Sequence, residues 1–135
     1  MNVFILDLKH QPGELAKATE AIAKKGIDIT AFSGVTCGSS GTVAFLTSDE
    51  VAARRALTEA GYSPRELEVV TTTFENAPGT LAATARKLAN AGINIEFALP
   101  TAMSGGNVTI AFATDNPTKA HSVLGAREPV GAGAR

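Results

Sequence analysis

Residues 74–95 read FENAPGTLAATARKLANAGINI, and this stretch decides the fold. Pro78 and Gly79 open a helix in which Leu81, Ala85 and Leu88 recur at helical spacing, and Gly92 ends it. The pattern therefore predicts a strand, a tight loop, a helix and a second strand. Backbone N–H groups at a helix start have no partner inside the helix, and the helix dipole adds partial positive charge there. The loop therefore fits a carboxylate.

The same pattern occurs earlier in the chain, as LKHQPGEL over residues 8–15 and KGIDI over residues 25–29. Pro78 follows Pro12 by 66 residues, and Gly92 follows Gly26 by the same 66. A fixed offset across the loop, the helix and the next strand indicates an internal duplication.

The order of Pro-Gly loop, helix, Gly-Ile-(Asn/Asp)-Ile, hairpin and helix resembles the ACT domain, a small regulatory module of amino-acid metabolism. The resemblance covers about residues 3–124 as two copies. It implies a ferredoxin-like fold and allosteric binding of a free amino acid, without naming which one.

One long strand is expected at residues 66–75, because these ten residues contain no Gly or Pro and many β-branched side chains. It must end the first copy and begin the second. The predicted fold class is therefore α+β, with two ferredoxin-like βαββαβ repeats that share a largely continuous antiparallel sheet with helices on one face. The expected divisions are repeat one at 1–65, repeat two at 66–124 and a flexible tail at 125–135.

Composition excludes several classes of function. The net charge is −1, which argues against a nucleic-acid or membrane surface as the main partner. A single cysteine, Cys37, excludes an internal disulfide framework and suits a reducing cytosol. Met1 leads directly into an apolar strand, so we expect no signal peptide, and no apolar run approaches a membrane span. The expected location is cytoplasmic.

The resemblance also implies a binding site. In ACT domains the ligand lies between the Pro-Gly loop and the start of the second strand, next to polar residues two before the Pro and two after the helix-stop Gly. Repeat two has Asn76 and Asn94 there, whereas repeat one has His10 and Asp28. The expected ligand-binding residues are Asn76, Ala77, Gly79, Thr80, Leu81, Asn94 and Ile95 in repeat two, and His10, Gln11, Gly13 and Asp28 in repeat one. The alternative for Asn76 is a structural one, in which its side chain caps the turn.

No nucleophile–base set or carboxylate pair has catalytic spacing, and the two histidines are too isolated to indicate a metal. We therefore expect a non-catalytic sensor of a small or apolar amino acid, without a cofactor, that acts on a regulated enzyme or another protein. A homodimer is expected, with the strand at 27–36 as its pairing edge. Two alternatives remain open: an interaction module without a ligand, and a small ferredoxin-like enzyme.

Overall fold

The structure is a computed structural model that describes residues 1–125. The described chain divides into two compact units, one formed by Asn2–Leu67 and the other by Met1 with the residues from Glu68 onward. Most of the predicted tail at 125–135 lies outside the described residues. No helix among the described residues is long and apolar enough to cross a membrane.

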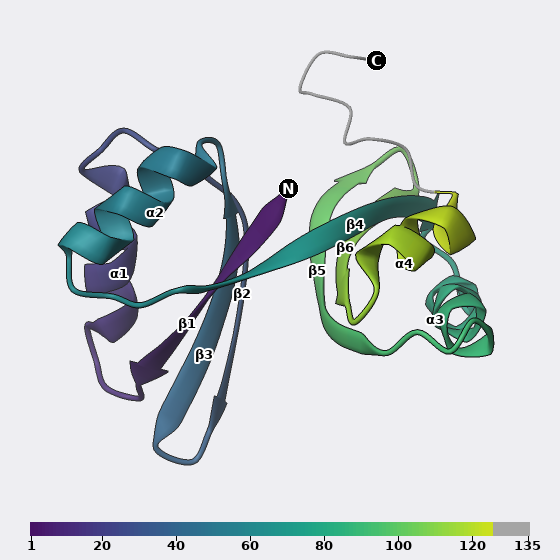
Figure 1. The fold of residues 1–135 in the computed structure, drawn as a ribbon, viewed down its shortest axis with the longest axis horizontal. Coiled ribbons are helices and arrows are strands. Elements are labelled where there is room, and N and C mark those ends of the chain that lie inside the picture. Colours follow the sequence, from purple (N-terminus) through teal and green to yellow (C-terminus); the bar gives the residue numbers. More distant parts are fainter. Residues whose placement is uncertain (126–135) are drawn as a thin grey trace. The chain divides into compact units, whose positions relative to one another are not determined.

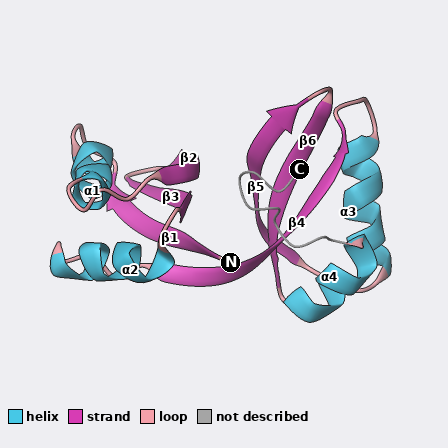
Figure 2. Ribbon diagram, turned by 90° about the horizontal axis from the view of Figure 1, so that it is seen from above, coloured by secondary structure: helices cyan, strands magenta, loops and turns pink. Residues whose placement is uncertain are grey.

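Repeat one follows the predicted order β-α-β-β-α (Figure 1). Its elements are β1 (Asn2–Lys9), α1 (Glu14–Ala23), β2 (Ile29–Cys37), β3 (Ser40–Thr47) and α2 (Glu50–Glu59). The central strand is β3, which pairs antiparallel with β1 on one side and with β2 on the other. Both α1 and α2 cover one face of this sheet (Figure 2).

The core of repeat one lies between these helices and the sheet. Phe4 on β1 and Phe45 on β3 stack with ring centroids 5.9 Å apart, and both are buried. Ile22 of α1 and Leu57 of α2 are fully buried against them. Apolar residues at alternate strand positions therefore hold both helices in place.

Repeat two has the same order. Its elements are β4 (Arg65–Glu75), α3 (Thr80–Asn90), β5 (Ile95–Ser104), β6 (Asn107–Thr114) and α4 (Pro117–Leu124). The central strand β6 pairs antiparallel with β4 and β5, and the core joins Val70, Leu88, Ile93, Phe112 and Ala120. The order of elements in the two units confirms the expected ferredoxin-like repeats.

The strand β4 runs without interruption from Arg65 to Glu75, as the sequence predicts. Its first residues belong to the unit of repeat one, where an Arg65 guanidinium nitrogen lies 3.1 Å from Asp7 Oδ1. In the unit of repeat two, the Val69 N–H donates to the Met1 carbonyl at 2.9 Å. The unit of repeat one therefore contains the first residues of β4, and Met1, which precedes β1, belongs to the unit of repeat two.

Two helices begin with a side-chain cap. Asp49 Oδ1 accepts from the Ala52 N–H at 3.1 Å, and Asn116 Oδ1 accepts from the Lys119 N–H at 3.1 Å. Leu15 and Leu81, in the first turns of α1 and α3, are 42% and 56% exposed. Both side chains lie next to a Pro-Gly loop.

Candidate functional site

The two Pro-Gly loops have almost identical backbones. Gly13 has φ 90° and ψ −12°, and Gly79 has φ 89° and ψ −11°. This left-handed conformation favours glycine at both positions. Each glycine directly precedes the first helical residue, so the same local geometry opens α1 and α3 and exposes the helix start.

In repeat two, backbone hydrogen bonds hold the loop. The Asn76 N–H donates to the Gly106 carbonyl at 2.8 Å, and the Ala77 N–H donates to the Glu75 carbonyl at 3.0 Å. The Thr80 N–H, expected as an open donor, instead makes a long bond of 3.3 Å to the Ala77 carbonyl. Asn76 is exposed. Gly79 is the N-cap residue of α3, and no side chain caps the start of this helix. Among residues 1–125 the Asn76 side chain caps no helix.

Asn94 lies at the other end of the strands from Asn76. Its N–H donates to Asp115 Oδ1 at 3.0 Å, just after β6, whereas Asn76 lies beside the β5–β6 turn. The strand register places Glu75 opposite Asn107, and Ile95 opposite Thr114, at the two ends of β6. At about 3.4 Å per residue, the two asparagines are roughly 24 Å apart. The structure does not bring them together within repeat two.

Ile95 stays with Asn94 at that far end. It begins β5, is half-buried and packs against the core of repeat two. Five of the expected residues of repeat two therefore remain together at the Pro-Gly loop and can contact one ligand. They are Asn76, Ala77, Gly79, Thr80 and Leu81.

Repeat one repeats this separation. The His10 N–H donates to the Ser39 carbonyl at 3.1 Å, next to the β2–β3 turn, and the Gln11 N–H donates to the Lys9 carbonyl at 2.9 Å. Asp28 lies at the opposite end, where its N–H donates to Ser48 Oγ at 3.0 Å. His10, Gln11 and Gly13 therefore form one cluster, and Asp28 does not join it.

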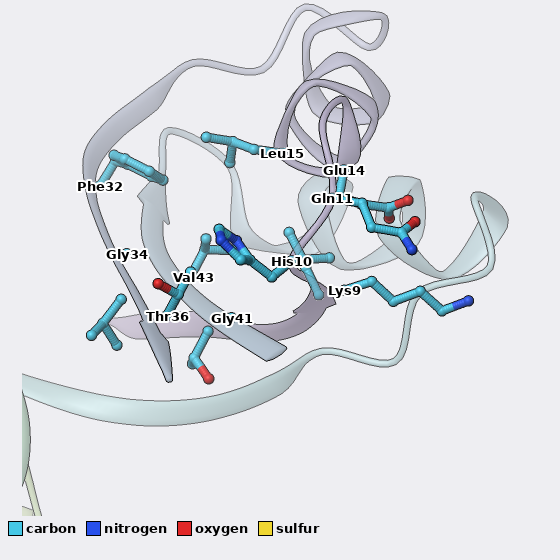
Figure 3. Close-up of a pocket in the computed structure, with 13 residues that line it drawn as sticks. Lys9, His10, Gln11, Glu14, Leu15, Phe32, Gly34, Thr36, Gly41 and Val43 are labelled. Carbon is cyan, nitrogen blue, oxygen red and sulfur yellow. The ribbon is translucent and has the colours of Figure 1, made fainter. Parts of the chain in front are cut away.

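A cavity of about 340 Å³ lies beside the loop of repeat one (Figure 3). The loop, the first turn of α1 and the strands β2 and β3 all contribute to it. Its lining residues are Leu8, Lys9, His10, Gln11, Glu14, Leu15, Phe32, Gly34, Val35, Thr36, Gly41, Thr42 and Val43. Sequence reasoning missed the part that β2 and β3 supply. The available signal was a glycine inside each strand, Gly34 and Gly41, because such glycines mark a close approach or an open space.

The described residues contain a free thiol and no cluster of metal ligands. No three His, Cys, Asp or Glu side chains among residues 1–125 come together in a way that could hold a metal ion. Cys37 is exposed at the end of β2. What the loops present instead is exposed backbone at a helix start with polar and apolar side chains around it, an arrangement suited to binding a small molecule.

Comparison with solved structures supports the fold assignment. A protein from Bacteroides thetaiotaomicron, BT0572, is 25% identical, with a TM-score of 0.81 over 92% of this chain and 85% of that chain. The ligand-free regulatory subunit of aspartate kinase from Thermus thermophilus is 20% identical, with a TM-score of 0.65 over 92% of this chain and 89% of that chain. The corresponding subunit from Thermus flavus is 21% identical, with a TM-score of 0.64 over 92% and 89%.

No curated protein matches the sequence. The ACT domain pair family matches residues 41–128, which is more than half of the chain and includes parts of both repeats. Together with the duplicated Pro-Gly loops and the two βαββα units, this match shows that the chain belongs to the ACT domain pair family.

Proposed function

We propose that this protein is a non-catalytic regulatory module that binds a small free amino acid and acts on another protein. The observation that carries the proposal is the loop of repeat two, where Asn76 and Gly79 are exposed beside the start of α3. A site for a free amino acid needs an oxygen that accepts from the ligand's ammonium group and, close to it, an N–H group that donates to the ligand's carboxylate. Asn76 offers both functional groups in its amide, and the helix start offers backbone donors.

In this arrangement the ligand's carboxylate meets the N–H groups of Gly79 and Leu81. Its ammonium group meets the Asn76 Oδ1 atom. The side chain is small or apolar, because Ala77 and the exposed Leu81 stand beside the loop and carry no charge. Thr80 contributes less than its neighbours, because its N–H and hydroxyl already donate to the Ala77 carbonyl.

The regulatory role rests on the family and on the roles of similar solved structures. Two of these are regulatory subunits of aspartate kinase. We infer that the present chain likewise transmits ligand binding to an enzyme or another protein, and that it does so in the cytoplasm. The competing hypotheses are an interaction module without a ligand and a small enzyme on the same fold.

Isothermal titration calorimetry with a panel of free amino acids tests the proposal. We expect binding that Asn76→Ala weakens by about 1–3 kcal/mol, the cost of losing a hydrogen bond to a charged group. His10→Ala is the matched change in the other loop and should have a smaller effect. If no common amino acid gives heat or a melting shift at millimolar concentration, the sensor hypothesis fails and the interaction module replaces it.

Asn94→Ala is the second variant. Because Asn94 lies at the far end of β6, it should leave affinity unchanged if one repeat holds the ligand alone. An equal loss in Asn76→Ala and Asn94→Ala would mean that the two residues contact the ligand from different molecules of the protein. Unchanged binding in both variants would place the ligand outside the loop of repeat two.

A further inference from the structure

The charged side chains of repeat two are sorted by element. Its helix layer, formed by α3 and α4, carries the cations Arg86, Lys87 and Lys119, and all three are exposed. Neither helix contains an Asp or Glu residue. The acidic residues within 68–125 lie on the strands or directly after one, at Glu68, Glu75, Glu96 and Asp115. The helix layer is therefore basic, although the whole chain has a net charge of −1.

The two helices of this layer form one surface. They contact each other and cover the same face of the sheet (Figure 1), where Leu88 of α3 and Ala120 of α4 are buried in one core. Arg86 lies two residues before Leu88, which is more than half a turn around the helix, so it faces away from that core. The ion pairs among residues 1–125 include none of the three cations. Their charge is therefore open to a partner.

Repeat one shows that the fold does not require a basic helix layer. Its two helices carry both signs of charge, at Glu14, Lys17, Glu20, Glu50, Arg54, Arg55 and Glu59. Two of these cations are paired, Lys17 with Glu14 at 3.7 Å and Arg54 with Glu66 at 2.6 Å. When the helices are aligned at their first residues, Glu20 corresponds to Arg86 and Ala52 corresponds to Lys119. The basic layer is therefore a property of repeat two alone.

Helix stability does not explain the basic layer either. Lys119 is the third residue of α4, where the helix dipole already adds partial positive charge, so a cation there is unfavourable. Lys87, in the last turn of α3, is placed favourably for the dipole. Arg86 and Lys119 thus have no stabilising role that the described residues reveal, which points to a binding role outside the repeat.

We propose that the helix layer of repeat two is a docking surface for an acidic face of the regulated protein. Complementary charge speeds association and fixes the orientation of two partners. Ala82, Ala83 and Ala89 are exposed on α3 near Arg86, so the partner's carboxylates can approach this cation without a bulky neighbour. The inference rests on the proposed function for the existence of a regulated protein, but none of the three cations belongs to a Pro-Gly loop.

A membrane surface fits this layer less well. Helices that lie on a membrane bury large apolar side chains beside their basic ones. Within α3 and α4, which the structure describes in full, the large apolar side chain that is exposed is Leu81, in the first turn beside the loop. The surface around the cations offers alanines instead. An acidic protein face is therefore the better match.

NMR titration of the full chain with a short oligoglutamate peptide tests the surface, with oligolysine as the comparison. We expect the backbone amide signals of Arg86, Lys87 and Lys119 to shift with oligoglutamate and not with oligolysine. Raising the ionic strength from about 0.01 M to 0.15 M shortens the Debye length from about 30 Å to about 8 Å, and this should weaken the binding. No shift in these signals at low ionic strength would overturn the inference.

Charge variants locate the surface. Arg86→Glu, which introduces the residue of repeat one, should weaken oligoglutamate binding by about threefold or more, in line with the modest strength of exposed charge pairs. Lys119→Ala should weaken it as well and keeps the test valid if Arg86→Glu does not fold. Arg55→Glu is the matched control, because Arg55 is exposed on α2 and the charge change is the same. An equal loss in Arg55→Glu would mean that only net charge matters, and would overturn the inference.

Two further measurements separate this inference from its neighbours. Arg86→Glu should leave the calorimetric binding of free amino acids unchanged, because Arg86 lies outside the Pro-Gly loop. If no amino acid binds the wild-type chain while oligoglutamate still shifts α3 and α4, the sensor hypothesis fails and the docking surface stands. Sedimentation with vesicles of phosphatidylcholine and phosphatidylserine is the second measurement. Vesicle binding that Arg86→Glu abolishes, without any effect of oligoglutamate, would replace the protein partner with a membrane.

Discussion

Arg54 on α2 holds Glu66 on β4 through two hydrogen bonds, from Nε to Oε2 and from a terminal nitrogen to Oε1, both 2.6 Å long. Asn2 adds a third contact to the same carboxylate at 3.4 Å. The bonds from Arg54 hold the pKa of Glu66 below its ordinary value, and the pKa of Arg54 is raised in turn. This pair of hydrogen bonds, the Arg54–Glu66 fork, fixes the start of β4 to α2 of repeat one.

The fork makes stability depend on pH. Because the folded pKa of Glu66 is depressed, its contribution is fully present above the ordinary glutamate pKa of about 4.3 and is lost as pH falls through the folded value. We expect Glu66→Gln to lower the melting temperature at pH 7 and to lose this difference in acid. Melting curves from pH 7 to pH 3 measure it. A difference that stays constant over that range would contradict the pKa shift.

The loop glycines should matter for stability before any ligand is added. A side chain at Gly79 must adopt φ near 90°, which costs about 1–2 kcal/mol for most residues. We expect Gly79→Ala to lower the free energy of unfolding in urea by that amount. Gly79→Asn is the matched control and should lose less, because Asn tolerates left-handed backbone better. Equal losses in the two variants would locate the cost elsewhere than in the backbone angle.

Two leucines of α3 differ in how deeply they are buried. Leu88 is fully buried in repeat two, whereas Leu81 is 56% exposed. We expect Leu88→Ala to cost about 2–5 kcal/mol of unfolding free energy, through lost burial and the cavity left behind. Leu81→Ala should change stability by no more than about 0.5 kcal/mol, as is usual for surface substitutions. Urea unfolding of both variants checks this, and a large loss in Leu81→Ala would contradict the described exposure.

Much of the fold follows from local sequence signals. Pro-Gly, the helix-stop glycines and a strand without Gly or Pro over residues 66–75 predicted the two repeats and the single strand β4. Helical spacing groups Leu81 with Leu88, yet Leu81 is exposed because it lies in the first turn of α3 beside its loop.

The site was less predictable, since it depends on which ends of the strands meet. Asn76 and Asn94 occupy positions that resemble one site, yet the register places them at opposite ends of β6. Arg54 and its partner Glu66 lie 12 residues apart on different elements, so no local pattern links them. To predict the cavity of repeat one, one would have to know that Gly41 pairs with Leu8 and Thr36. No periodicity in the sequence encodes that pairing.

The assembly gives the last prediction. Within repeat one, β2 pairs with β3 on one side, and its other side pairs with no described strand of that repeat. Phe32 and Val35 on β2 are 47% and 68% exposed. Because an exposed strand edge with apolar side chains favours pairing with another chain, we expect a homodimer through β2.

Val35→Lys tests this edge, because a charged side chain on an edge strand opposes pairing. The variant should shift the mass by light scattering toward the 13.8 kDa monomer at micromolar concentration. Val51→Lys is the matched control, since Val51 is 63% exposed on α2, away from the edge, and this variant should keep the wild-type mass. A wild-type protein that is already monomeric would refute the dimer, whereas a dimer that survives Val35→Lys would refute only the assignment to β2.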